Sequence, residues 1–251
     1  MPQWTVDTHP LAVIGDDPDG SDDVTRVHGP VLLSDGAVAF WDDARGQIAV
    51  YEPDGTERRR IGRRGQGPGE FQNIFRLVQS GDTLIAADGG NDRISLYSPH
   101  LDLLAVTQGA RQCGLAVITG RLPDGRYLAD NTMWLQPGLP VTQSTERLAS
   151  PLFLATPSQC DTLAEFPGAE MRVIETRYRG HRGTQQVFVN YGRRTVSAAW
   201  DSLIAVGTEA IWQVDLLTEN GNLVRSIRLP WSPRATPAGL KDSIIQQELE
   251  R

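Results

Sequence analysis

The sequence predicts an all-β fold, a β-propeller built from four-stranded antiparallel blades, on three observations. Its 25 glycines and 16 prolines lie between short alternating segments rich in Val, Ile, Leu, Tyr and Phe, which is typical of many short strands. A turn aspartate recurs at Asp35, Asp82, Asp124 and Asp201, with separations of 47, 42 and 77 residues. Each copy continues through strands that end near Asp, aromatic and Pro residues. Roughly forty residues with four strands is the period of a propeller blade.

We expect a single propeller domain over residues 1–251. An N-terminal strand and an acidic linker occupy 1–25, and the blades are expected at 26–62, 71–109, 113–168 and 172–230, with insertions near 131–148 and 172–190. The spacing of Leu240, Ile244, Ile245 and Leu249 predicts a short C-terminal helix over 236–251. Four recognisable blades indicate part of a six-bladed propeller, or an incomplete ring that needs a partner and is prone to self-association.

Composition narrows the function classes. The net charge of -7 and the 39% hydrophobic content are typical of a soluble globular protein. No window reaches the roughly 18 apolar residues of a membrane span, and residues 1–20 lack the pattern of a secretory signal, so localisation stays open. The acidic balance makes nucleic-acid binding an unfavoured class. Cys113 and Cys160 are too few for a disulfide framework, and the sequence leaves their pairing open.

One stretch carries a family resemblance. The linker GQGPGEF at 65–71, followed by ADGGNDRI at 87–94, resembles the NHL repeat and the bacterial six-bladed propeller proteins. The resemblance covers about residues 26–109 and implies the propeller fold. It implies little about function, because propellers host many activities, and similar proteins are often exported.

Propeller geometry predicts which loops share one face. The loops between second and third strands, and those that join consecutive blades, gather around the channel on one side. Ligand or partner binding is therefore predicted for a set of polar and aromatic residues on those loops: Arg63, Arg64, Glu70, Asn91, Asp92, Asn131, Trp134 and Arg193. The other tryptophans, Trp41, Trp200 and Trp212, are expected to pack between blades.

Three aspartates occupy equivalent places in the repeats. Asp42, Asp88 and Asp130 each follow a second strand, and together they would offer oxygen ligands to an axial Ca²⁺. The favoured interpretation is that each accepts hydrogen bonds from its own turn, so that no cofactor is expected. Gluconolactonase-like propellers hold such a calcium through Glu, Asn and Asp, but this sequence shows no matching ligand set, so no catalytic role is transferred.

The sequence therefore favours a non-catalytic scaffold that binds a protein, peptide or glycan partner. It contains no Gly-x-Ser-x-Gly elbow and no His-Glu-x-x-His motif. The alternatives are a calcium-dependent lactonase-like hydrolase and an RNA-binding protein that uses its arginine-rich loops.

Overall fold

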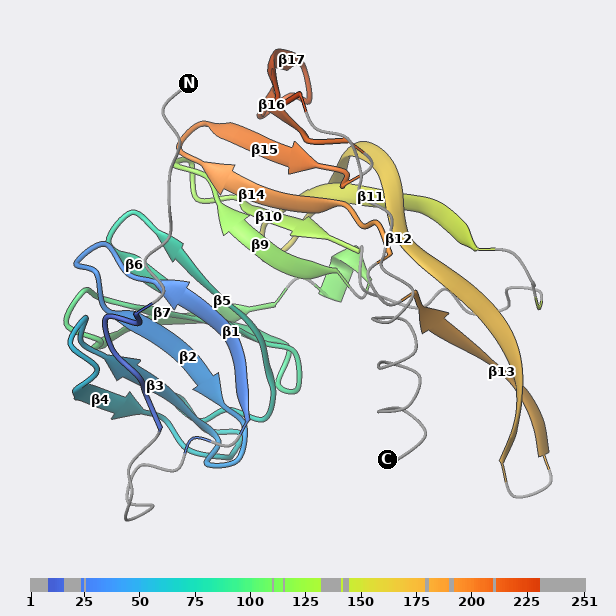
Figure 1. Ribbon diagram of the computed structural model, residues 1–251. Coiled ribbons are helices and arrows are strands. Elements are labelled where there is room, and N and C mark those ends of the chain that lie inside the picture. Colours follow the sequence, from blue (N-terminus) through green and yellow to red (C-terminus); the bar gives the residue numbers. More distant parts are fainter. Residues whose placement is uncertain are drawn as a thin grey trace.

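The structure is a computed structural model that describes residues 9–15, 24, 26–109, 111–114, 116–131, 141, 145–178, 181–189, 192–209 and 211–230. Within these residues the fold is all-β, as predicted, with four antiparallel sheets and one 3₁₀ turn (Figure 1). No helix among them is long and apolar enough to cross a membrane. The helix predicted over 236–251 and the candidate residue Trp134 lie outside the described residues.

The first two sheets follow the predicted blades closely. The first contains β1 (Val27–Leu32), β2 (Val38–Asp42), β3 (Gln47–Tyr51) and β4 (Glu57–Ile61), paired in chain order. The second contains β5 (Ile74–Ser80), β6 (Thr83–Asp88), β7 (Arg93–Tyr97) and β8 (Leu103–Gln108), also in chain order. Each sheet is therefore an up-and-down meander, which is the topology of a propeller blade.

The third sheet has five strands and ends later than the sequence suggests. It contains β9 (Val117–Arg121), β10 (Tyr127–Asp130), β11 (Glu146–Ala155), β12 (Cys160–Tyr178) and β13 (His181–Phe188). The region around 172–190, expected to open the fourth blade, instead extends β12 and adds β13 to the third sheet. Residues 172–190 contain no proline and no Asp-Gly turn, so the sequence alone marks no break between the two sheets.

The fourth sheet begins at 196. It contains β14 (Val196–Trp200), β15 (Leu203–Gly207), β16 (Gln213–Thr218) and β17 (Leu223–Arg228). The start of the fourth blade is thus corrected from 172 to 196.

Recurring Asp-Gly turns connect the strands. Asp35 accepts a hydrogen bond from the N–H of Ala37 at 3.1 Å, and the intervening Gly36 has φ +89°. The turns at Asp54 and Asp124 repeat this arrangement, with carboxylate distances of 3.0 and 2.9 Å to the N–H two residues later. A residue with a Cβ would be strained at the positive φ of this glycine. The aspartate carboxylate takes the place of a backbone carbonyl as a hydrogen-bond acceptor in the turn.

Consecutive sheets share a core, and this fixes their order around an open ring. Separate apolar clusters join the first sheet to the second, the second to the third, and the third to the fourth. Where β9 meets β14, a Cβ on Gly120 would lie 2.5 Å from the Ala199 Cβ, so only glycine allows that approach. The first and fourth sheets share no cluster among the described residues, and Figure 1 shows them apart. The described strands therefore form a partial propeller rather than a closed ring.

Candidate functional site

The linker between the first and second sheets is fixed by its own glutamate. The Glu70 carboxylate accepts hydrogen bonds from the Gly67 N–H at 2.8 Å and from the Arg63 Nε at 2.7 Å. These donors, the Gly67 N–H first, hold the pKa of Glu70 below its ordinary value. Phe71 is fully buried, and its ring lies edge-on to Trp41 with centroids 5.9 Å apart. The linker is thus a packed crossing.

The turn after β6 holds the same linker from the other side. The Asn91 Nδ2 donates to the Gly65 carbonyl at 2.9 Å. Arg93 donates to the Gln66 carbonyl at 2.7 Å and also to the Glu70 carbonyl. Of the predicted binding residues, Glu70 and Asn91 are therefore engaged in holding two sheets together.

Asp92 adopts a turn conformation beside this linker. Its φ is +50°, and its carbonyl accepts the Gly109 N–H at 2.8 Å. A left-handed conformation is one that aspartate tolerates better than most residues. The backbone of Asp92 thus shapes the place where the chain leaves β8.

The three predicted metal ligands are buried, and each has its own local partners. Asp88 accepts from five donors, which are the N–H groups of Gln72, Asn73, Gly90 and Asn91 and the Asn91 Nδ2, at 2.7–3.2 Å. Asp42 accepts the Arg45 N–H at 3.1 Å and pairs with the Arg60 guanidinium at 2.9 Å. Asp42 and Asp88 thus accept hydrogen bonds from their own turns, as the favoured interpretation predicts, and both also bind groups outside those turns.

Asp130 belongs to a different environment. Its Oδ2 accepts a hydrogen bond from the Ser197 Oγ at 2.7 Å, and Ser197 in turn lies 2.9 Å from the Thr119 Oγ1. This buried network joins the third sheet to the fourth. Among the described residues, no three His, Cys, Asp or Glu side chains gather where they could hold a metal ion.

The predicted arginines are paired with carboxylates. The side chain of Arg63 is 78% exposed, yet its guanidinium lies 2.6 Å from Glu70. Arg64 lies 3.1 Å from Asp43. Arg193 lies 2.5 Å from Glu170, and although burial opposes ionisation of Glu170, hydrogen bonds from Arg193 outweigh it and lower its pKa. These pairs reduce the positive field expected from the arginine-rich loops.

Asn131 is the remaining predicted residue that the structure describes. It directly follows β10, and its side-chain Oδ1 is buried without a hydrogen-bond donor among the described residues. The predicted residues therefore form no single site. Arg63, Glu70 and Asn91 meet at the linker, whereas Arg193 lies beside the third sheet.

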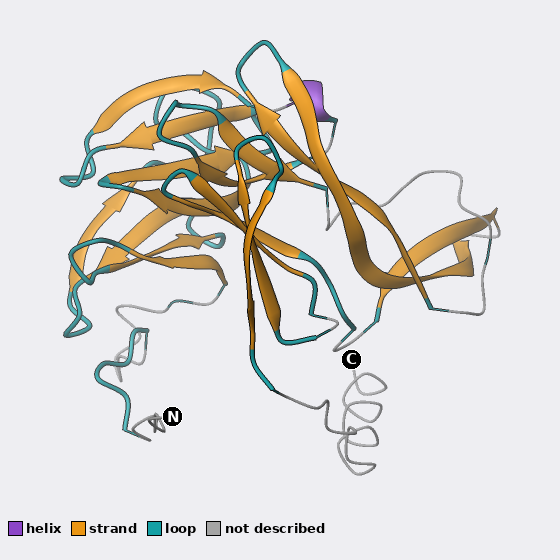
Figure 2. Ribbon diagram, turned by 90° about the horizontal axis from the view of Figure 1, so that it is seen from above, coloured by secondary structure: helices purple, strands orange, loops and turns teal. Residues whose placement is uncertain are grey.

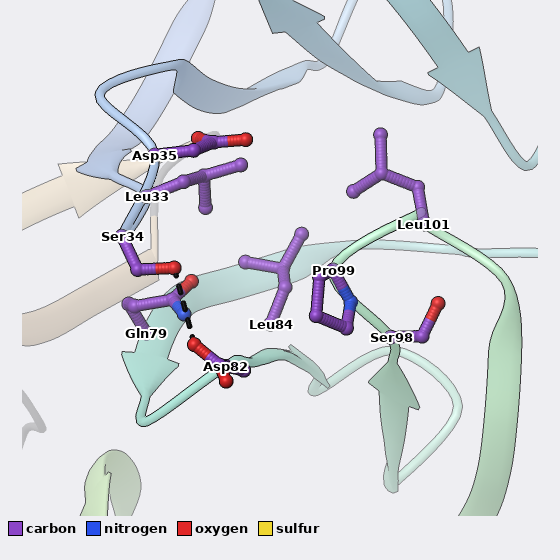
Figure 3. A pocket seen from close by; sticks show the side chains of 9 residues that line it. All are labelled: Leu33, Ser34, Asp35, Gln79, Asp82, Leu84, Ser98, Pro99 and Leu101. Atoms are coloured by element: carbon purple, nitrogen blue, oxygen red, sulfur yellow. Dashed lines mark hydrogen bonds between the residues drawn. The ribbon is translucent and has the colours of Figure 1, made fainter.

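Two hollows lie at the ends of the sheets away from the linker. Both include turns that join the first and second strands of a sheet. One hollow of only about 10 Å³ lies between the first two sheets (Figure 3). Leu33, Leu84 and Leu101 point into it, and the Ser34 Oγ donates to Asp82 at 3.4 Å across its rim. Its small volume and leucine lining are those of an imperfectly filled space between blades.

A larger hollow, about 460 Å³, lies where the β5–β6, β9–β10 and β14–β15 turns meet. Its lining is mixed and comes from three sheets: Gln79, Ser80, Gly81, Arg121, Leu122, Pro123, Ala199, Trp200 and Asp201. The Arg121 guanidinium lies 5.8 Å from the centroid of the Tyr127 ring, which holds the cation beside the hollow. We call this the three-turn hollow.

Trp200 is the aromatic residue of the three-turn hollow, and 61% of it is exposed. The prediction that Trp200 and Trp212 pack between blades is wrong, since Trp212 is also 56% exposed, whereas Trp41 is buried as expected. Alternation in β14 explains the error for Trp200: the core face of this strand carries Ser197 and Ala199, so Trp200 is not packed into the core shared with the third sheet. No sequence signal separates Trp200 from the buried Trp41, since an aspartate follows both residues.

Comparison with known proteins gives fold-level similarity. No family model matches the chain, and no curated protein sequence matches it. A member of the DUF4221 family from Bacteroides vulgatus is similar over 82% of this chain and 59% of that one, with 10% identity and a TM-score of 0.47. Virginiamycin B lyase from Staphylococcus aureus matches over 84% and 72%, with 9% identity and a TM-score of 0.40.

A third similar structure is the nidogen/laminin complex. The match covers 83% of this chain and 82% of that chain, with 12% identity and a TM-score of 0.41. At these identities no residue role passes from any of the three proteins to this chain.

Proposed function

We propose that this protein is a non-catalytic binding propeller, with an NHL-like linker between its first two blades, and that the three-turn hollow receives the ligand. The observation that carries this proposal is the exposed Trp200 at a polar hollow shared by three sheets. An indole left in water at a concave surface is costly, and it is typical of sites where a partner or a sugar ring covers it.

The chemistry of the lining suits a neutral or partly anionic ligand such as a glycan or a peptide. Arg121 offers guanidinium donors, Gln79 an amide, and Asp201 a carboxylate, and these three residues line the same hollow as Trp200. Three turns from separate sheets hold these groups, so the site is positioned by the packed blades rather than by one loop.

The test is ligand binding by a matched pair of tryptophan variants. Arrays of immobilised oligosaccharides and synthetic peptides would supply a ligand, and its dissociation constant would then be measured by tryptophan fluorescence. We expect Trp200→Ala and Arg121→Ala to weaken binding at least tenfold. Trp212→Ala removes an equally exposed indole from the same sheet, outside the lining of the hollow, and should leave binding within twofold of the unsubstituted protein.

Two results would contradict this proposal. Binding that survives Trp200→Ala but is lost with Trp212→Ala would place the ligand elsewhere on the fourth sheet. Saturable calcium binding by calorimetry, abolished by Asp88→Ala together with a lactone-hydrolysing activity, would favour the hydrolase alternative instead.

A further inference from the structure

Two charged residues of the three-turn hollow differ from their counterparts in other turns. Arg121 and Asp201 both line the hollow, and among the described residues neither forms an ion pair. Arg126, at the other end of the same β9–β10 turn, lies 2.6 Å from Asp124 and 2.7 Å from Glu219. The hollow therefore contains one cation and one anion that have no counter-ion within the described part of the chain.

Asp201 also differs from the other aspartates of the repeat. Asp35 and Asp124 each accept the N–H two residues later and pair with an arginine, and Asp82 accepts a serine hydroxyl at 3.4 Å. No such donor reaches the Asp201 carboxylate from the described residues. Its φ is +53°, and Gly81 holds the same place in the β5–β6 turn with φ +55°. An aspartate thus stands where a glycine would be less strained, and the turn does not use its carboxylate.

Packing holds Arg121 in place without neutralising it. Arg121 lies opposite Tyr127 in the β9–β10 ladder, and its guanidinium lies over the ring of that buried tyrosine. The Arg121 carbonyl accepts the Ser80 Oγ at 3.2 Å, which joins the end of β9 to the end of β5. A guanidinium held in this way loses less conformational freedom when it forms a bidentate pair with a carboxylate.

The lining of the hollow favours a sugar over a peptide. It comes from three of the short loops that join strands (Figures 1 and 2), and β5, β9 and β14 contribute only their last one or two residues. These segments are too short to form a ladder with an added peptide strand. A sugar ring has an apolar face that suits the exposed indole of Trp200 and a rim of hydroxyls that suits amide and carboxylate groups. The volume of about 460 Å³ is within the usual range for a ligand site.

We propose that the three-turn hollow binds an acidic glycan, in which the carboxylate of a uronic acid unit pairs with Arg121 and sugar hydroxyls donate to Asp201. This inference rests on the proposed function and adds the class of ligand to it. The planar guanidinium matches a carboxylate through two parallel hydrogen bonds. The preference is for a sparsely charged sugar, because Asp201 and the net charge of -7 disfavour a densely anionic chain.

The test is calorimetric titration with trisaccharides of galacturonate, glucuronate and mannuronate, each compared with its methyl ester. Esterification removes the charge and leaves the hydroxyls in place. We expect at least one trisaccharide to bind saturably, with a dissociation constant at least tenfold below that of its ester, and added salt should reduce this difference. No saturable binding of any of the three acids, or equal binding of acid and ester, would overturn the proposal.

Variants assign the two charges. Arg121→Gln should weaken binding of the acid at least tenfold and bring acid and ester within twofold of each other. Asp201→Ala should weaken binding of the uncharged ester at least threefold, because the ester still presents its hydroxyls. Arg126→Gln removes a paired cation of the same turn, outside the lining, and should change both less than twofold.

Unchanged discrimination between acid and ester in Arg121→Gln would contradict the proposal. If that variant fails to fold, the comparison of acid with ester on the unsubstituted protein still decides between the two outcomes. Tighter binding of a fully sulfated trisaccharide than of every uronate would also argue against recognition of a single carboxylate.

The same experiment separates this inference from the proposed function. Trp200-dependent binding of neutral oligosaccharides or of peptides, without binding of the acids, would exclude the acidic glycan and keep the hollow as the ligand site. Acid binding that neither Trp200→Ala nor Arg121→Gln weakens would overturn both, since the ligand would then lie elsewhere on the protein.

Discussion

Two carboxylates hold in place the loops that were predicted to form a functional face. Glu70 and Asp88 together accept hydrogen bonds from both ends of the linker and from the turn after β6. The linker glycines follow from the same contacts, since a Cβ on Gly62 would lie 2.3 Å from the Phe71 ring while the backbone there has φ +80°. The residues that resemble the NHL pattern thus have a direct structural role in this chain.

Glu70→Gln should make stability depend less on pH. The pKa of Glu70 is lowered from about 4.5 in the folded protein, first by the Gly67 N–H and then by Arg63. Its ionised form therefore adds stability above its ordinary pKa, and that contribution is lost as the pH falls through the lowered folded value. We expect urea unfolding to show a less stable variant at pH 7 and a difference that disappears in acid.

Asp201→Asn is the control for this experiment. Asp201 lies in a turn and forms no ion pair with the described residues, so its substitution should change stability little at any pH. A Glu70→Gln deficit that persisted below the lowered pKa would contradict the electrostatic explanation.

At the scale of elements, a disulfide joins the segment that leads into the third sheet to the start of β12, the fourth strand of that sheet. Cys113 in the 3₁₀ turn (Arg111–Cys113) is bonded to Cys160 at the start of β12, 47 residues later. The bond closes a loop that contains β9, β10 and β11. A cross-link over such a loop restricts the unfolded chain and stabilises the fold.

Removal of this disulfide should destabilise the protein by about 2–4 kcal/mol, the usual range for a native bridge. The double variant Cys113→Ser, Cys160→Ser would be compared with the unsubstituted protein by thermal unfolding, with and without dithiothreitol. The reductant should lower the melting temperature of the unsubstituted protein alone. An equal shift in both proteins would show that the pairing does not form in solution.

At the scale of the whole molecule, the open ring makes stability uneven. Among the described residues, the second sheet contributes to two shared cores, whereas the fourth sheet contributes three buried residues, Ile204, Val206 and Leu217, and the partly buried Ala199 to a single core. All six residues of β17 are exposed. In a stack where each sheet contacts only its neighbours, the two terminal sheets have one neighbour each, and the one with the smaller shared core, the fourth, opens first.

Native-state hydrogen exchange should therefore separate the sheets. We expect the slowest amides in β6 and β7 and the fastest strand amides in β17, with the fourth sheet opening below the global unfolding free energy. Uniform protection of all four sheets would contradict this expectation and indicate that an additional element covers the fourth sheet.

The sequence by itself determined the all-β class, the blade period and the positions of the first two sheets. These features are local, because strand alternation and Asp-Gly turns depend on neighbours along the chain. It also indicated that Asp88 would accept hydrogen bonds from its own turn, and Gly90 and Asn91 donate to it there, whereas the donors from Gln72 and Asn73 in the linker were not predicted. The three-turn hollow was not predicted, because its lining comes from turns far apart in the sequence.

Only the tertiary structure decided which surfaces are covered. Trp41 and Trp200 both precede an aspartate at or near the end of a strand, yet one is buried and the other exposed. The second sheet packs over Trp41, whereas no apolar cluster of the described residues includes Trp200. The same reason explains why residues 172–188 extend the third sheet and why Cys113 meets Cys160. Burial and pairing depend on which sheet packs against which, and that is a property of the folded chain.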